Sequence, residues 1–106
     1  MAISFSQDDV FPIIRRIIIS IHDKKQDFVT HNEIVTALLA DSSGHNEIIS
    51  AQKMRPHETT EHIAANMVAW FSQRITVGAS IYINSFERKK ISGRWAYRPH
   101  QKIARS

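Results

Sequence analysis

The strongest constraint on the fold is the spacing of the apolar residues, which is helical up to about residue 78 and strand-like after it. Over residues 8 to 23, the apolar stripe of an amphipathic helix is formed by Val10, Phe11, Ile13, Ile14, Ile17, Ile18 and Ile21. Many of these residues are β-branched and are weak helix formers, so burial of the stripe must stabilise the helix. We expect Asp8 or Asp9 to cap it and Pro12 to lie in its first turn.

A second helix is predicted after the short extended piece Phe28-Val29. Thr30 and Glu33 have the spacing of a capping box, in which each residue satisfies a backbone N–H of the other. The apolar positions of this helix are Ile34, Val35, Leu38 and Leu39.

The second helix should end near Asp41, because the turn-forming residues Ser42-Ser43-Gly44 follow it. We expect Gly44 to adopt the left-handed conformation that commonly ends a helix. A weaker apolar pattern predicts a short further helix from His45 to Arg55.

A longer helix is predicted after Pro56, capped by Thr59 or Thr60 and ended by Gly78. Its buried face would consist of Ile63, Met67, Trp70, Phe71 and Ile75. Residues 86 to 98 then have the pattern of two strands around a tight turn at Ser92-Gly93. The predicted fold class is therefore α+β, with three to four helices and a C-terminal β-hairpin.

This order of elements resembles the winged helix-turn-helix superfamily, and more narrowly the restriction-enzyme-associated and HARE-type winged-helix modules. The resemblance covers residues 8 to 98, from the first helix through the phrase Phe28–Ile34 to the closing segment Phe86–Tyr97. It implies that the hairpin is a wing and that the helix after Thr59 is the recognition helix. One departure is that 19 residues separate Leu39 from Thr59, whereas a tight helix-turn-helix has a connection of three or four.

Length and composition limit the classes of protein that this chain can belong to. The 106 residues fit one domain, which we divide into a core over 8–98 and a basic tail over 99–106. The longest apolar run, Ile17-Ile18-Ile19, is too short for a membrane-spanning helix, and Asp8-Asp9 argues against a secretory signal. The absence of cysteine excludes disulfides, iron–sulfur clusters and thiolate zinc sites. We expect a cytoplasmic protein, associated with the nucleoid if bacterial.

Positive charge is concentrated at the end of the chain. Residues 85 to 106 contain seven Lys and Arg against one Glu, a balance of +6, whereas the other 84 residues sum to −2. Clustered cations are typical of phosphate-binding surfaces, although a solvated tail that confers solubility would have the same composition. The candidate phosphate contacts are Arg88, Lys89, Lys90, Arg94 and Arg98.

Polar side chains with helical spacing flank the buried stripe of the helix after Thr59. They are His62, Asn66 and Gln73, with the small residue Ala69 among them. Asn and Gln can form paired hydrogen bonds with adenine in the major groove of DNA. The alternatives are an ordinary exposed face and close packing of the alanines in a dimer.

Two aromatic residues, Trp95 and Tyr97, alternate along the last strand. They could stack on unpaired bases, as in single-strand binders, but we favour a core position for both. The length of the hairpin turn leaves open which cations share their face.

We identify no catalytic, metal or cofactor site. His57 and His62 are five residues apart, about 140° around a helix, so they cannot chelate a metal from a regular helix. We expect His22, His31, His45 and His100 to be exposed polar residues. The glycine-rich loop that cradles a phosphate is also absent.

The sequence therefore predicts a non-enzymatic protein that binds duplex DNA as a regulator or accessory module, as a homodimer or with a larger protein partner. The alternatives are a protein-interaction module on a winged-helix scaffold and a binder of RNA or single strands.

Overall fold

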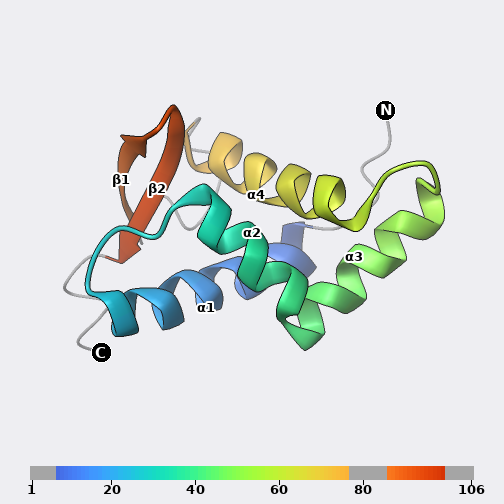
Figure 1. Cartoon of the computed structure of the whole chain (residues 1–106), viewed down its shortest axis with the longest axis horizontal. Helices are drawn as coiled ribbons and strands as arrows, with labels where there is room; N and C mark the ends of the chain where they lie inside the picture. The colour runs from blue at the N-terminus through green and yellow to red at the C-terminus, as the bar shows by residue number, and fades with distance from the viewer. Residues whose placement is uncertain (1–6, 77–85, 100–106) are drawn as a thin grey trace.

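The computed structural model describes residues 7–76 and 86–99 and has the predicted α+β class. Figure 1 shows its helices and its antiparallel hairpin. The elements are α1 (Gln7–Lys25), α2 (His31–Ala40), α3 (Ser42–Met54), α4 (Thr60–Thr76), β1 (Phe86–Ile91) and β2 (Arg94–Pro99). The expected helix end at Gly78 and the basic tail beyond Pro99 lie outside the described residues.

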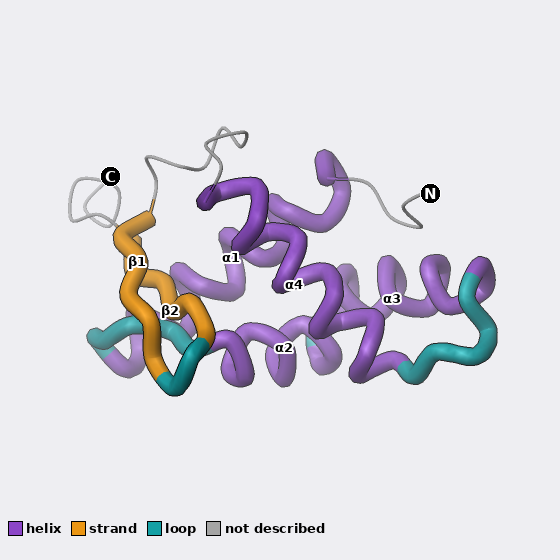
Figure 2. The backbone as a smooth tube through the Cα atoms, turned by 90° about the horizontal axis from the view of Figure 1, so that it is seen from above, coloured by secondary structure: helices purple, strands orange, loops and turns teal. Residues whose placement is uncertain are grey.

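The helices form a layered body with the hairpin at one end. In Figure 1, α1 lies along the lower edge of the molecule and α4 along the upper edge; Figure 2, seen from above, shows α2 to one side of both. The hairpin and α3 lie at opposite ends of the molecule in both views (Figures 1 and 2). The hairpin therefore lies next to the C-terminal half of α4, away from the helix that joins α2 to α4.

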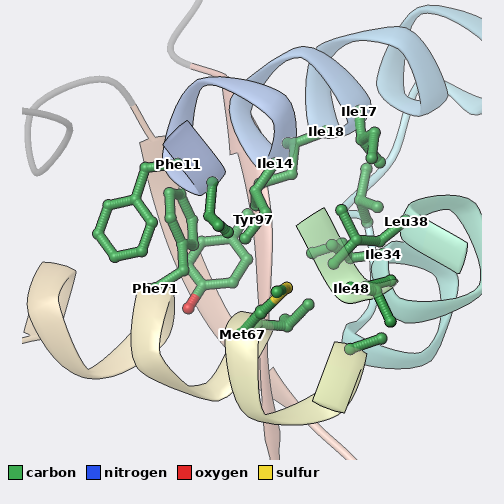
Figure 3. Packing of buried hydrophobic residues seen from close by; sticks show 14 of the residues in the cluster. Phe11, Ile14, Ile17, Ile18, Ile34, Leu38, Ile48, Met67, Phe71 and Tyr97 are labelled. Carbon is green, nitrogen blue, oxygen red and sulfur yellow. The ribbon is translucent and has the colours of Figure 1, made fainter. Parts of the chain in front are cut away.

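The predicted apolar stripes form one continuous core. Buried residues come from α1, α2, α3, α4 and the hairpin. Figure 3 shows the rings of Phe11, Phe71 and Tyr97 together on one side of this core. The centroid of the Phe71 ring lies 5.1 Å from that of Phe11 and 5.5 Å from that of Tyr97. Trp70, which we expected to be buried, is half-buried at the edge of the core.

The hairpin has a two-residue turn at Ser92-Gly93. Both residues have positive φ, 53° and 82°, which is the requirement of a type I′ turn. Arg88 pairs with Tyr97 and Lys90 with Trp95, so these four side chains share one face of the hairpin. The strand register that the sequence left open is thus defined by the turn.

The capping box that predicts the start of α2 is present. The Thr30 hydroxyl accepts a hydrogen bond from the backbone N–H of Glu33 at 3.2 Å, and the Glu33 carboxylate accepts one from the backbone N–H of Thr30 at 2.9 Å. Lys25, at the end of α1, also donates to that carboxylate, at 2.7 Å. The capping box therefore ties the ends of two consecutive helices together.

Our prediction for Gly44 was wrong. Only Asp41 separates α2 from α3, and its carboxylate accepts a hydrogen bond from the backbone N–H of Gly44 at 2.9 Å, so Ser42 to Gly44 form the first turn of a helix. The helix predicted from His45 consequently begins at Ser42. Gly44 is needed for close packing, because a Cβ atom there would lie 2.5 Å from the carbonyl oxygen of Leu38.

The start of α1 also differs from the prediction. The helix already includes Gln7, so Asp8 and Asp9 lie within it and Pro12 is its sixth residue, beyond the first turn. A proline there removes one backbone hydrogen bond. Val10 and Phe11, which directly precede Pro12, are fully buried, and their burial offsets the loss.

Candidate nucleic-acid interface

The hairpin carries its cations on both faces. Antiparallel pairing places Arg88 and Lys90 on the face of Trp95, whereas Lys89, Arg94 and Arg98 lie on the opposite face. The side chains of Lys89, Lys90 and Arg94 are exposed, and they lie within three residues of the turn. The end of the hairpin therefore carries a cluster of positively charged side chains that are exposed to solvent.

On one face, the indole ring of Trp95 holds two cations. The guanidinium carbon of Arg88 lies 4.5 Å from the ring centroid, and the Lys90 Nζ lies 5.4 Å from it. Attraction between a cation and the ring face restricts the motion of these long side chains. Trp95 is half-buried and packs against the core, so our prediction of a core position is correct only in part.

On the other face of the hairpin, the ring of Phe28 also contacts two cations. The guanidinium carbon of Arg98 lies 4.4 Å from the Phe28 ring centroid and the Lys89 Nζ 5.4 Å from it. Arg98 also donates a hydrogen bond to the Glu87 carboxylate at 2.8 Å. Because that acid neutralises it in part, Arg98 is a weaker candidate for phosphate contact than Lys89 or Arg94.

Tyr97 is a core residue, as predicted. Its side chain is fully buried, and its hydroxyl forms a hydrogen bond with that of Ser72 on α4. Burial raises the pKa of the Tyr97 hydroxyl to about 12. A ring enclosed in this way cannot stack on a nucleic-acid base.

The residues predicted on the solvent face of α4 are exposed, namely the polar His62, Asn66 and Gln73 and the small Ala69. The helix begins where the Thr59 hydroxyl accepts a hydrogen bond from the backbone N–H of His62 at 3.1 Å. The His62 Nε2 lies 3.6 Å from a carboxylate oxygen of Glu58. Glu58 also pairs with Arg55 at 3.0 Å, so the exposed acid at the N-terminal end of α4 is Glu61, whereas the middle of the face is neutral and polar.

The hairpin turn and α4 lie along the same edge of the molecule (Figure 1). The core lies below α4, so its exposed residues point away from the body, on the side where the hairpin ends. In Figure 1 the turn and α4 thus share the upper edge, but Figure 2 places the cations of the turn beside the start of α2 and apart from the C-terminal end of α4.

His31 contradicts our expectation of an exposed histidine. It is the first residue of α2 and is only 8% exposed. Its pKa is lowered, first by burial and then by the positive charge of Arg94 at the hairpin turn. The signal for its burial is in the sequence, because His31, Ile34 and Leu38 have the spacing of one helix face.

The structure also bears on metal binding and on membrane spans. Within residues 7–76 and 86–99, no three His, Asp or Glu side chains lie close enough together to hold a metal ion. His57 lies in the turn between α3 and α4 and His62 within α4. No helix in the same ranges is long and apolar enough to cross a bilayer.

The chain matches no protein-family model, and no curated protein or solved structure is significantly similar to it.

Proposed function

We propose that the protein is a winged-helix protein that binds duplex DNA without catalysing a reaction, with the hairpin as the wing and α4 as the recognition helix. The observation that carries this proposal is the set of exposed cations at the hairpin turn, on the same edge of the molecule as the exposed polar face of α4. Cations that neutralise phosphates supply most of the affinity of such proteins, and a helix in the major groove supplies specificity.

The arrangement of the hairpin supports this assignment. Val29, between α1 and α2, forms an isolated antiparallel bridge with Tyr97 of β2, and this bridge attaches the two-stranded hairpin to the helical body. The long connection between α2 and α4 consists largely of α3, which packs against both helices. The departure from a tight helix-turn-helix is therefore an ordered insertion, and α2 still contacts α4 directly.

Duplex DNA is favoured over a single strand by the state of the two hairpin aromatics. Tyr97 is enclosed, and Trp95 is half-buried beneath Arg88. Single-strand binders need aromatic faces that are open to successive bases. Cations that extend from a supported hairpin instead suit the regular phosphate backbone of a duplex.

Asn66 is our candidate for reading a base, because it is exposed in the middle of α4, one helical turn beyond His62, which lies beside the Glu58 carboxylate. Gln73 lies two turns further along the same face, nearer the hairpin. A bidentate contact between such an amide and adenine contributes roughly 1–3 kcal/mol of discrimination.

The test is fluorescence anisotropy with a labelled duplex and with its single strand, each titrated at two salt concentrations. We expect tighter binding to the duplex and a steep loss of affinity as the salt concentration rises. Replacing Lys89 and Lys90 together by Ala should weaken binding and reduce the magnitude of the salt slope by about 2, one for each phosphate contact. The matched control replaces Lys24 and Lys53, exposed lysines on α1 and α3, and should change neither quantity appreciably.

Absence of duplex binding at low salt would reject the proposal and favour a protein partner. Preference for the single strand would also reject it and favour a protein that binds RNA or single strands. Equal effects of the two double variants would show that only net charge matters. The role of Asn66 is tested separately by Asn66→Ala in a selection from random duplexes, with Ser50→Ala on α3 as the control. Unchanged sequence preference would remove Asn66 from base reading.

A further inference from the structure

The outer face of α1 has a shape that another helix can fit. It contains a solvent-open hollow of about 550 Å³, lined by Arg15, Arg16, Ile19, Ser20, Asp23 and Lys24. These residues form two neighbouring rows with a spacing of four. Such rows are the ridges of an α-helix, and the groove between two of them receives a ridge of a packed helix.

The row Arg15-Ile19-Asp23 is complementary to itself when it is reversed. It has a positive charge, an apolar side chain and a negative charge, each one helical turn from the next. In an antiparallel pair of α1 helices with the two Ile19 residues opposite each other, Arg15 of each copy faces Asp23 of the other. Four residues correspond to about 6 Å along the axis on either side of Ile19, so both charge pairs align at once.

These charges are available for contact with a second copy. Among the described residues, neither Arg15 nor Asp23 forms an ion pair with its side chain. Arg16, in the neighbouring row, is already neutralised by Asp41 through two hydrogen bonds of 2.9 and 3.0 Å. Lys24 is exposed near the end of α1, where its long side chain can remain in water.

We propose that a second copy of this chain occupies the groove, forming a symmetric antiparallel dimer in which α1 packs against α1 around Ile19. A twofold interface of this kind uses the same patch on both copies, so each favourable pair occurs twice. The apolar contact is small and both ion pairs are exposed, so the dimer should be weak and sensitive to salt. The proposal does not depend on DNA binding, because α1 and α4 lie along opposite edges of the molecule (Figure 1).

The experiment is sedimentation velocity of the full chain, without DNA, over a wide range of concentrations. Wild type should change from monomer to dimer as its concentration rises. Asp23→Arg and Arg15→Asp each place like charges opposite one another at both ends of the interface, and each should raise the dimer dissociation constant by about tenfold or more. The combined variant Arg15→Asp with Asp23→Arg restores opposite charges and should restore dimerisation.

Lys53→Glu, a charge reversal of an exposed residue on α3, is the matched control and should dimerise like wild type. Circular dichroism of each variant verifies that the helices are intact. The proposal is overturned by a wild-type chain that is monomeric at every concentration, by single variants that dimerise as well as wild type, or by a double variant that remains monomeric. The recovery in the double variant separates pairing across the interface from damage to the fold.

Discussion

The backbones of Val29 and Tyr97 are joined by two hydrogen bonds. The Val29 N–H donates to the Tyr97 carbonyl at 2.7 Å, and the Tyr97 N–H donates to the Val29 carbonyl at 2.9 Å. The side chain of Tyr97 extends into the core and bonds to Ser72 of α4 through its hydroxyl. A single residue therefore attaches the hairpin both to the segment before α2 and to α4, and this attachment determines where the cations of the turn lie.

The first prediction concerns the ionisation of Tyr97. Burial raises its pKa to about 12, above the ordinary value of 10.0, because the charged phenolate is poorly solvated in the core. The contribution of Tyr97 to stability is complete below pH 10 and is lost as the pH rises towards 12, since the unfolded chain releases this proton first. The loss amounts to about 2–3 kcal/mol at the upper end of this window.

Tyrosinate absorbance, followed during a pH titration, measures this pKa. The chain has two tyrosines, so comparison with Tyr97→Phe assigns the transition of Tyr97, which we expect near pH 12. Loss of its hydrogen bond to Ser72 should also destabilise the variant at neutral pH, by roughly 1 kcal/mol. Two ordinary transitions near pH 10 in wild type would contradict the burial of this ring.

The second prediction concerns Asp41, which caps α3 and pairs with Arg16. Asp41→Ala should lower the free energy of unfolding by roughly 1–2 kcal/mol in urea denaturation at neutral pH. Asp41→Asn should cost less, because an asparagine side chain can still accept the hydrogen bond from the Gly44 N–H. Equal losses in the two variants would indicate that the ion pair, and not the cap, supplies the stability.

The pH dependence of the same variants distinguishes the two contributions. The hydrogen bonds from Arg16 are the largest cause of the lowered pKa of Asp41, and the Gly44 N–H lowers it further. A lowered carboxylate pKa contributes stability above the ordinary value of 3.8, and this stability is lost as the pH falls through the folded-state value. Asp41→Asn should therefore lose less stability than wild type on acidification.

Local signals in the sequence predicted much of the fold. The capping box of Thr30 and Glu33 located the start of α2 because both of its bonds are formed within four residues. The apolar stripes of α1 and α4 predicted which faces are buried, since a single period repeats over several turns. Ser92-Gly93 marked the hairpin turn for a similar local reason.

Features that depend on contacts between distant residues were not predictable in this way. Gly44 has the sequence context of a turn, and its actual role appears only when Leu38 is placed against it. The contacts of Phe28 with Lys89 and Arg98 join residues that are 61 and 70 positions apart, and no local pattern indicates them. For the candidate interface, the sequence thus supplied the cations of the hairpin but not the rings that support them.

The third prediction tests the packing role of Gly44. Alanine normally stabilises a helix relative to glycine, but Gly44→Ala would place Cβ 2.5 Å from the Leu38 carbonyl oxygen and 2.8 Å from its Cδ1. We expect the free energy of unfolding to fall by roughly 1–3 kcal/mol. Ser50→Ala, at an exposed position of the same helix, is the control and should change stability by no more than about 0.5 kcal/mol. A stabilised Gly44→Ala variant would mean that the α2–α3 junction is looser than this geometry requires.

The fourth prediction concerns the electrostatic effect of Arg94 on His31, which links the hairpin turn to the start of α2. Burial is the main cause of the lowered His31 pKa, and the charge of Arg94 adds to it. Neutral His31 therefore contributes stability above the ordinary value of 6.5, and this contribution is lost as the pH falls through the lowered folded-state pKa.

Arg94→Ala should raise the His31 pKa in an NMR titration of the imidazole C–H signals, assigned by comparison with His31→Gln. The control, Lys53→Ala on α3, is at the end of the molecule opposite the hairpin and should not change the His31 pKa (Figure 1). Equal His31 pKa values in wild type and Arg94→Ala would show that the hairpin turn does not lie close to the start of α2 in solution.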